Sequence, residues 1–503
     1  MSFLRNSTAN FLGGLLPAVA LFVTIPLIVH RMGAEAYGAL VLITSIVGYF
    51  GIMDINATAG TVKYVAEHQA RGESDEVGRV VSFGLLIYFA IGAAGGLALF
   101  FGAGHLVNQV FKIDPSWRTD AYCALQVASL AFFFGQIQVF LQSIPQALGR
   151  YDLSGRFDAL FGSLAPLLTI AVVWGGGGLT AIVAARLVLS TAHCAALLVL
   201  LRRLLPSIRL RRPDRLTSRK VASFSLFTYL QRLASVTSNN ADKLLIGAQQ
   251  SMLALATYVI PFTLAGRMFA LLNRFVHGMF PLTSHLDARA DHPALRSTFI
   301  YVSRYMAFLN IALCLLLALF SRELLTYWLR QPAEPVAVLV LIIVAYMMLV
   351  ESLTNAPSLV NDGLGRPHIT GVAALLRVAF GVSAAWMALR LGGIVELAVS
   401  QLVVGAVFTA AFLWVVHRHS LPWRLGSVVG AIYGVNAVVL LAGTALVAWR
   451  WGDPLMGRWA FAGALAGAIV LLAGVGWLYI LFPAHRVRLR DLAAARLPRI
   501  ASL

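Results

Sequence analysis

Long apolar segments recur along almost the whole chain, and they restrict the fold more than any other feature of the sequence. Each is close to the roughly 20 residues that an α-helix needs to cross a bilayer core of about 30 Å. The composition agrees, because 59% of the 503 residues are hydrophobic and only 12% are charged. We count fourteen such segments, at 10–30, 37–60, 80–103, 121–143, 158–174, 180–201, 221–247, 253–281, 298–320, 336–358, 369–390, 393–417, 426–449 and 459–482.

Backbone hydrogen bonding decides between the two ways of crossing a membrane. Every N–H and C=O in the apolar core must be paired internally, and the segments are too long and continuous for alternating barrel strands. The sequence therefore predicts an all-α integral membrane protein. Cys123, Cys194 and Cys314 all fall inside apolar segments without a C-x-x-C pair, so we expect packing roles, no metal site and no cofactor.

Basic residues between the segments indicate an orientation. The net charge is +18. With a cytoplasmic N-terminus, inside loops hold roughly three times as many Lys and Arg as outside loops, which predicts cytoplasmic N- and C-termini. The cluster between segments six and seven favours topology and attraction to anionic lipid over nucleic-acid binding. It comprises Arg202, Arg203, Arg209, Arg211, Arg212, Arg215, Arg219 and Lys220.

The same cluster divides the chain into two comparable halves. We expect an N-terminal lobe at 1–201, a basic linker at 202–220, a C-terminal lobe at 221–417, and an extra helix pair with a basic tail at 418–503. Similar segments beginning at Gly33 and Gly247 open the two halves. Six-helix repeats that start on the same side predict two lobes around a central cavity.

Small residues recur at helical spacing on both helices of the C-terminal pair. Such residues allow two membrane helices to approach closely. We expect these faces to pack together, with a partner interface as the alternative. The residues are Gly426, Gly430 and Gly434 on the first helix, and Gly463 and Gly467 on the second.

Ionisable side chains inside the apolar segments are the strongest indication of function, because they are costly at bilayer depth unless they face water or a partner. Arg232, Ser235, Asn239 and Lys243 follow one another at helical spacing and predict a polar stripe on one face. The neighbouring segment carries Arg267 and Arg274, while Arg186 and Arg377 add further positive charge.

A surplus of buried cations suits an anionic cargo. Guanidinium groups bind phosphate oxygens in bidentate geometry and stay charged when buried. We therefore predict that Arg186, Arg232, Asn239, Lys243, Arg267, Arg274 and Arg377 bind substrate. The alternative is that these cations pair with Asp54, Asp242, Glu351 or helix C-termini and only stabilise the bundle.

Two carboxylates are candidates for coupling transport to an ion gradient. Asp54 lies in the segment at 37–60, and Glu351 lies in the segment at 336–358. Burial favours the protonated form of a carboxylate, so either could carry a proton. A nearby arginine would instead keep it ionised in a structural ion pair.

Several short motifs occur in a familiar order. They include Arg31-Met-Gly-Ala-Glu-Ala-Tyr-Gly, the turn at Asp54, Gln146-Ala-Leu-Gly-Arg-Tyr-Asp and Asn239-Asn-Ala-Asp-Lys-Leu-Leu-Ile-Gly. Over nearly the whole chain, the sequence resembles the polysaccharide, or O-antigen, flippase family. That family belongs to one superfamily with MATE multidrug exporters and lipid II flippases.

The resemblance implies the cargo and the membrane. It implies that an undecaprenyl-diphosphate-linked oligosaccharide is flipped from the cytoplasmic to the outer leaflet of a bacterial inner membrane. Arg232, Arg267, Arg274 and Arg377 would then hold the diphosphate, and H⁺ or Na⁺ coupling is implied for some relatives.

Two other functions remain open from the sequence. A multidrug exporter for cationic drugs would need an acidic and aromatic cavity rather than arginines. A membrane-embedded polysaccharide polymerase or ligase would need an extramembrane catalytic loop, and the longest outside connection, at 104–120, has no catalytic constellation. We therefore expect a transporter rather than an enzyme.

Overall fold

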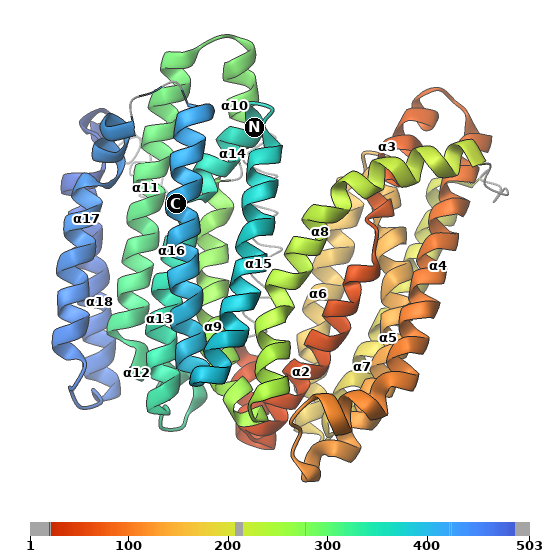
Figure 1. The fold of residues 1–503 in the computed structure, drawn as a ribbon, viewed down its shortest axis with the longest axis horizontal. Helices are drawn as coiled ribbons and strands as arrows, with labels where there is room; N and C mark the ends of the chain where they lie inside the picture. Colours follow the sequence, from red (N-terminus) through yellow and green to blue (C-terminus); the bar gives the residue numbers. More distant parts are fainter. Residues whose placement is uncertain are drawn as a thin grey trace, which may run out of the picture. The chain divides into compact units, whose positions relative to one another are not determined.

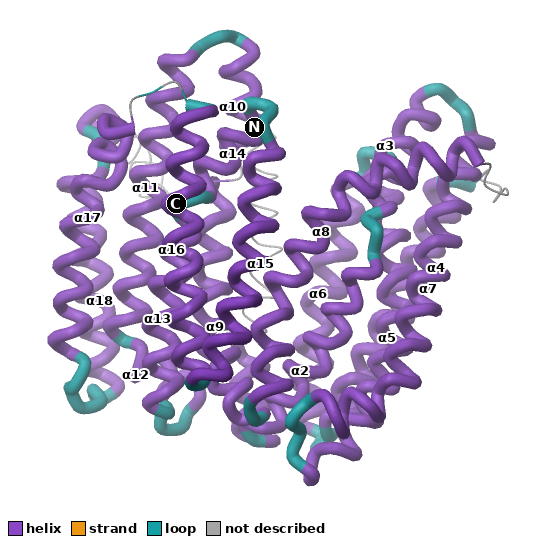
Figure 2. Tube along the Cα trace, in the orientation of Figure 1, coloured by secondary structure: helices purple, strands orange, loops and turns teal. Residues whose placement is uncertain are grey.

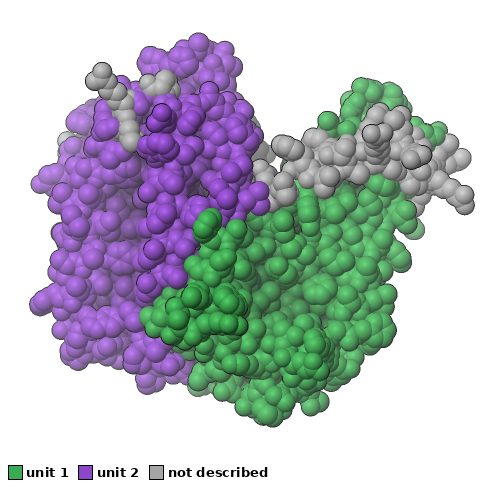
Figure 3. Space-filling model, viewed as in Figure 1, with its two compact units in different colours: residues 1–260, 378–396 green, residues 261–377, 397–503 purple. Residues whose placement is uncertain are grey.

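The computed structural model describes residues 20, 22–206, 215–276, 278–421, 423 and 425–487, and all regular structure in these residues is helical (Figures 1 and 2). The chain forms two compact units, residues 1–260 with 378–396 and residues 261–377 with 397–503 (Figure 3). Three helices have residues in both units: α9 (Met252–Asn273), α15 (Pro367–Leu391) and α16 (Ile394–His419).

Twelve described helices are long and apolar enough to span a membrane. The prediction of an all-α membrane fold is confirmed, but the predicted number of fourteen is not reached. The segment predicted at 10–30 begins outside the described residues, and its described remainder is the short apolar helix Phe22–Met32. The segment predicted at 221–247 forms α8 (Arg215–Gln249), which is 35 residues long but too polar to be counted.

The first unit is a bundle of long helices with a tightly packed centre. Gly84 brings α4 against α5, because a Cβ at this position would lie 2.0 Å from the Phe140 ring. Tyr88 and Phe140 are fully buried, with ring centroids 5.6 Å apart. The helices are α2 (Ala34–Phe50), η1 (Gly51–Met53), α3 (Ala57–Ala70), α4 (Ser74–His105), η2 (Leu106–Val110), α5 (Pro115–Ala147), α6 (Tyr151–Trp174), α7 (Leu179–Leu204) and α8.

The prediction of one continuous helix at 37–60 is wrong. The chain leaves the helix after η1, and α3 starts only at Ala57 (Figure 2, teal). Asn56 adopts a left-handed conformation with φ 56°, which asparagine tolerates better than most residues. Its N–H donates to Asp54 Oδ1 at 2.9 Å, an Asx turn that competes with the helix. Asp54 therefore lies in a break between two helices.

A 3₁₀ turn and a shorter helix also follow a long helix in the second unit, where η3 (Arg274–Val276) and α10 come after α9. The remaining elements of this unit are α10 (Met279–Ala288), α11 (His292–Leu319), α12 (Ser321–Leu329), α13 (Pro335–Ser352), α14 (Asn355–Gly363), α17 (Leu425–Arg450), α18 (Arg458–Val475) and η4 (Gly476–Ile480).

The predicted packing of glycines between the last two helices is wrong. Within the described part of the chain, a Cβ at any of the five glycines would meet no atom within 4 Å. Helix α17 packs along α11 instead, where a Cβ at Gly443 would lie 2.3 Å from Leu315. The most apolar stretch of α18 has none of its residues buried.

A buried ion pair connects α17 to α12. Arg450 Nη2 lies 2.6 Å from Glu323 Oε1, and the two side chains are 10% and 3% exposed. Arg450 Nη1 also donates to Leu319 O at 2.5 Å. Removing one partner of such a pair leaves an uncompensated buried charge.

We expect Glu323→Gln to lower the free energy of unfolding by about 3–5 kcal/mol, because Arg450 keeps its charge. Thermal unfolding of the purified protein in detergent measures this. The control is Glu67→Gln, which breaks the exposed Arg71–Glu67 pair and should change stability by less than about 1 kcal/mol. An equal loss in both variants would contradict the assignment.

Candidate functional site

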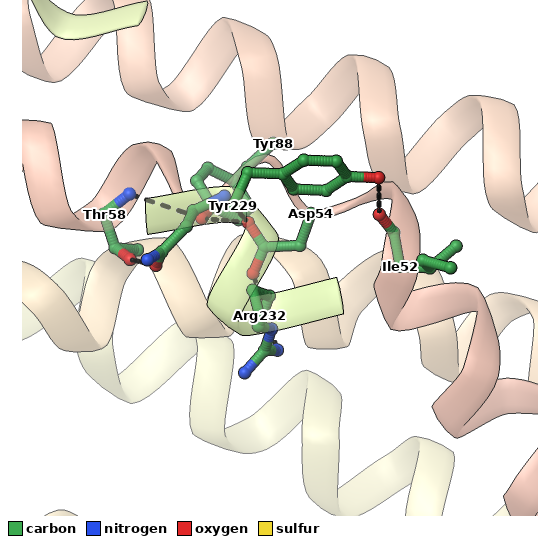
Figure 4. Close-up of polar contacts among 7 residues, drawn as sticks. Ile52, Asp54, Thr58, Tyr88, Tyr229 and Arg232 are labelled. Atoms are coloured by element: carbon green, nitrogen blue, oxygen red, sulfur yellow. Dashed lines mark hydrogen bonds and ion pairs between the residues drawn. The ribbon is translucent and has the colours of Figure 1, made fainter. Parts of the chain in front are cut away.

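The best-defined polar site of the first unit surrounds Asp54 in the break between η1 and α3 (Figure 4). Asp54 is 2% exposed. Its Oδ1 accepts a hydrogen bond from the Tyr88 hydroxyl of α4 at 2.6 Å and another from Asn56 N at 2.9 Å. Arg232 Nη2 of α8 lies 3.6 Å from Oδ2. The carboxylate is thus surrounded by hydrogen-bond donors from three elements.

A second tyrosine stabilises the break itself. The Tyr229 hydroxyl of α8 donates to Ile52 O at 3.0 Å, so it satisfies a carbonyl that the interrupted helix leaves free (Figure 4). Thr58 N donates to the Tyr88 oxygen at 3.4 Å. Because an unpaired backbone group is costly in a membrane, these contacts let a non-helical turn persist there.

The predicted polar stripe on α8 lies on an exposed face. Arg232, Ser235 and Asn239 are exposed, and Lys243 is half-buried. Asn239 Nδ2 donates to Ser235 O at 2.8 Å, and Lys243 Nζ donates to Asn239 O at 2.7 Å. Helix α8 contacts α2 and α3 and buries Ala234 and Ala241 on the side away from the stripe, and Val236 and Ile246 on the flanks of the stripe. Arg232 is therefore the exposed cation of the stripe.

The other predicted cations of this group belong to other elements than α8. Arg267 on α9 and Arg274 in η3 are exposed, and neither forms an ion pair with a described carboxylate. Arg186 is half-buried on α7 and lies close enough to Tyr37 of α2 to interact electrostatically. The structure does not place Arg186 beside the α8 stripe.

Glu351 and Arg377 form a second carboxylate–arginine pair, in the second unit. Arg377 Nη2 donates to Glu351 Oε1, and the side chains are 29% and 31% exposed. Glu351 lies near the end of α13, where the chain turns into α14. Thr409 Oγ1 of α16 donates to Val350 O beside it, at 3.4 Å. Here too, a carboxylate at a helix break meets an arginine from another helix.

These two ion pairs agree with the alternative that the cations in the apolar segments pair with carboxylates. Arg232 and Arg377 do meet the carboxylates named there, Asp54 and Glu351. Tyr88 and Tyr229 were not predicted, and no periodicity could have marked them, since each stands among apolar or weakly polar neighbours. Only the fold brings them to the break.

A family model described as polysaccharide biosynthesis protein matches residues 31–332. The chain belongs to this family. The resemblance noted from the sequence motifs is confirmed by this match. The region that matches the family runs from α2 to α12 and includes residues of both units.

Two curated relatives of this polysaccharide biosynthesis protein match over part of their length. One, named O-antigen transporter, from Shigella flexneri, is 24% identical over 26% of this chain and 30% of its own length. The other, membrane protein EpsK from Bacillus subtilis, is 21% identical over 32% of each chain. The chain thus covers about a third of each relative.

Solved structures establish the fold. An inward-closed structure of the lipid II flippase MurJ has a TM-score of 0.69 at 12% identity and covers 94% of this chain and 98% of its own. An inward-facing MATE multidrug transporter of the MOP superfamily has a TM-score of 0.67 at 14% identity, covering 82% and 99%. The polysaccharide biosynthesis protein therefore has the fold of these membrane transporters.

Proposed function

We propose that the protein flips an undecaprenyl-diphosphate-linked oligosaccharide across the bacterial inner membrane by alternating access, for polysaccharide or lipopolysaccharide biosynthesis. In this proposal the N- and C-termini are cytoplasmic. The family match and the transporter fold support it. The observation that carries the choice of cargo is the exposure of three arginines, Arg232 on α8, Arg267 on α9 and Arg274 in η3.

The physical reason lies in the cost of placing guanidinium groups at bilayer depth. An exposed arginine on a membrane helix is stable only where water or an anion reaches it. Arg232, Arg267 and Arg274 are exposed, and Arg232 has only a 3.6 Å contact with its carboxylate. A diphosphate accepts bidentate hydrogen bonds from such groups, while the lipid tail stays in the bilayer.

The other predicted residues have supporting roles in the proposal. Asn239 and Lys243 extend the same face of α8 and would contact the phosphate or the first sugar. Arg377 would approach the cargo from the second unit, and Arg186 would add to the positive field. Asp54 and Glu351 remain the candidates for H⁺ or Na⁺ coupling.

Deletion followed by lipid analysis tests the function. Loss of a flippase should leave lipid-linked oligosaccharide on the cytoplasmic face, with no exported product. Loss of a polymerase would instead leave single repeat units exported, and loss of a multidrug exporter would change drug tolerance while the glycan lipids stay normal. Either of the last two results would replace the proposed function.

A further inference from the structure

The three contacts of Asp54 differ in how readily they can be broken. The buried Tyr88 hydroxyl and the half-buried Asn56 N both reach Oδ1 at hydrogen-bond distance. Arg232 approaches only Oδ2, at 3.6 Å, and its side chain is 42% exposed whereas that of Asp54 is 4% exposed. Arg232 is thus the loosest partner of Asp54 and the one that an incoming group can reach (Figure 4).

We propose that a phosphate group competes with Asp54 for Arg232, and that Asp54 takes up a proton when Arg232 leaves it. The inference rests on the proposed function, because the phosphate belongs to the cargo. A phosphate offers two oxygens and a larger charge to the guanidinium than the single Oδ2 contact does. Asp54 would then be an ionised carboxylate without its cation in a buried site, which is strongly disfavoured.

Acid in the bulk solvent supplies the proton, which forms an O–H bond at Asp54 Oδ2, and the conjugate base stays in solution. When the phosphate departs, Arg232 returns and the proton leaves to water. In each transport cycle, the Asp54 carboxylate thereby exchanges the Arg232 guanidinium for a proton. The buried carboxylate is therefore either paired with Arg232 or protonated, and it is never ionised without a cation.

The surroundings of Asp54 favour a proton over a metal ion. Na⁺ needs several oxygen ligands, but Asp54 faces donors: a tyrosine hydroxyl, a backbone N–H and a guanidinium. The nearby Ile52 carbonyl already accepts from Tyr229.

The titratable groups that contact Asp54 come from two elements, Tyr88 from α4 and Arg232 from α8. Tyr88 is a positioning residue in this scheme. Its hydroxyl stabilises the ionised carboxylate and fixes its orientation, while its ring packs on Phe140 of α5. Removing only the hydroxyl should make proton uptake easier, while the ring keeps its packing on Phe140.

The test measures protons taken up on ligand binding to the purified full-length protein in detergent. Calorimetric titration with farnesyl diphosphate, in buffers of different ionisation enthalpy, gives both affinity and proton number. We expect Asp54→Asn to take up about one proton less per bound diphosphate than the native protein does. Its affinity should be equal or higher, because Arg232 no longer has a competing carboxylate.

The matched control is Asp152→Asn, the same substitution in the exposed Arg150–Asp152 pair of the same unit. It should leave the proton number unchanged. Tyr88→Phe is the second variant, and its proton uptake should persist but extend to higher pH. If Asp54→Asn does not fold, the extension of proton uptake to higher pH in Tyr88→Phe decides the test.

The outcomes separate the two proposals. If the native protein binds neither farnesyl nor undecaprenyl diphosphate, the proposed function fails, and the exchange at Asp54 fails with it. If it binds them and the proton number is the same in the native protein, Asp54→Asn and Asp152→Asn, only the exchange is overturned. An unchanged pH profile in Tyr88→Phe would also overturn it.

Discussion

Replacing both Arg267 and Arg274 with alanine should stop export of the lipid-linked oligosaccharide while the protein accumulates normally. Both side chains are exposed and without a described carboxylate partner, so their loss leaves no unpaired charge behind. If each donates a charge-assisted hydrogen bond to the diphosphate, the double variant should bind the cargo about 100-fold or more weakly. Surface display of the polysaccharide and the amount of membrane-inserted protein are the measurements.

The control for this prediction removes the same charge elsewhere. Arg71 and Arg289 are exposed residues that follow α3 and α10, outside the apolar spans. Replacing both with alanine should leave export unchanged. Normal export in the Arg267 and Arg274 variant would show that these two residues do not bind the cargo. An equal loss of export in both double variants would show that export depends on the total positive charge and not on these two positions.

Exchanging Glu351 and Arg377 should separate a structural ion pair from a binding residue. Arg377→Ala leaves Glu351 without its cation and should lower the free energy of unfolding by about 1–3 kcal/mol, and it should also abolish transport. The double variant Glu351→Arg with Arg377→Glu restores the pair. We expect it to recover the melting temperature but not transport. The arginine then stands on α13 instead of α15, so its guanidinium approaches the cargo from a different position.

The opposite pattern would identify a purely structural pair. If the exchanged variant recovers transport together with stability, Arg377 has no direct role in binding. If Arg377→Ala changes neither property, the pair contributes nothing measurable in either role. Melting temperature in detergent and export in cells are measured on the same variants.

The helices themselves could be predicted from the sequence because lipid imposes a strong rule. Twelve described helices meet the length and apolarity that a bilayer requires, as the spacing of apolar segments indicated. The stripe of Arg232, Asn239 and Lys243 also follows from helical spacing alone. In the structure Arg232 and Asn239 are exposed, and Lys243 is half-buried.

The helix break at Asp54 could not be predicted by the same reasoning. Hydropathy carries the apolar run through Gly51 and Asp54, and only the Asx turn and the left-handed Asn56 reveal the interruption. Tyr88 lies 34 residues along the chain from Asp54, within an ordinary apolar helix. Its hydrogen bond depends on packing between α3 and α4, which periodicity does not encode.

The glycines of the last helix pair also show that sequence spacing does not identify which helices pack together. Small residues indicate where helices can approach, but not which helix approaches. Helix α17 uses Gly443 against α11, whereas a Cβ at the regularly spaced Gly426, Gly430 or Gly434 would meet no atom of another described element within 4 Å. Spacing alone therefore predicted the wrong partner.

The most direct test of the central proposal is movement of cargo by the purified protein. The protein is reconstituted in liposomes that carry a fluorescently labelled undecaprenyl-diphosphate-linked oligosaccharide in both leaflets, and an impermeant quencher is added outside. We predict that label from both leaflets becomes accessible in liposomes with the native protein, and only outer-leaflet label in those with the Arg267 and Arg274 variant. Quenching confined to the outer leaflet with the native protein, under an imposed pH gradient of either direction, would contradict the account.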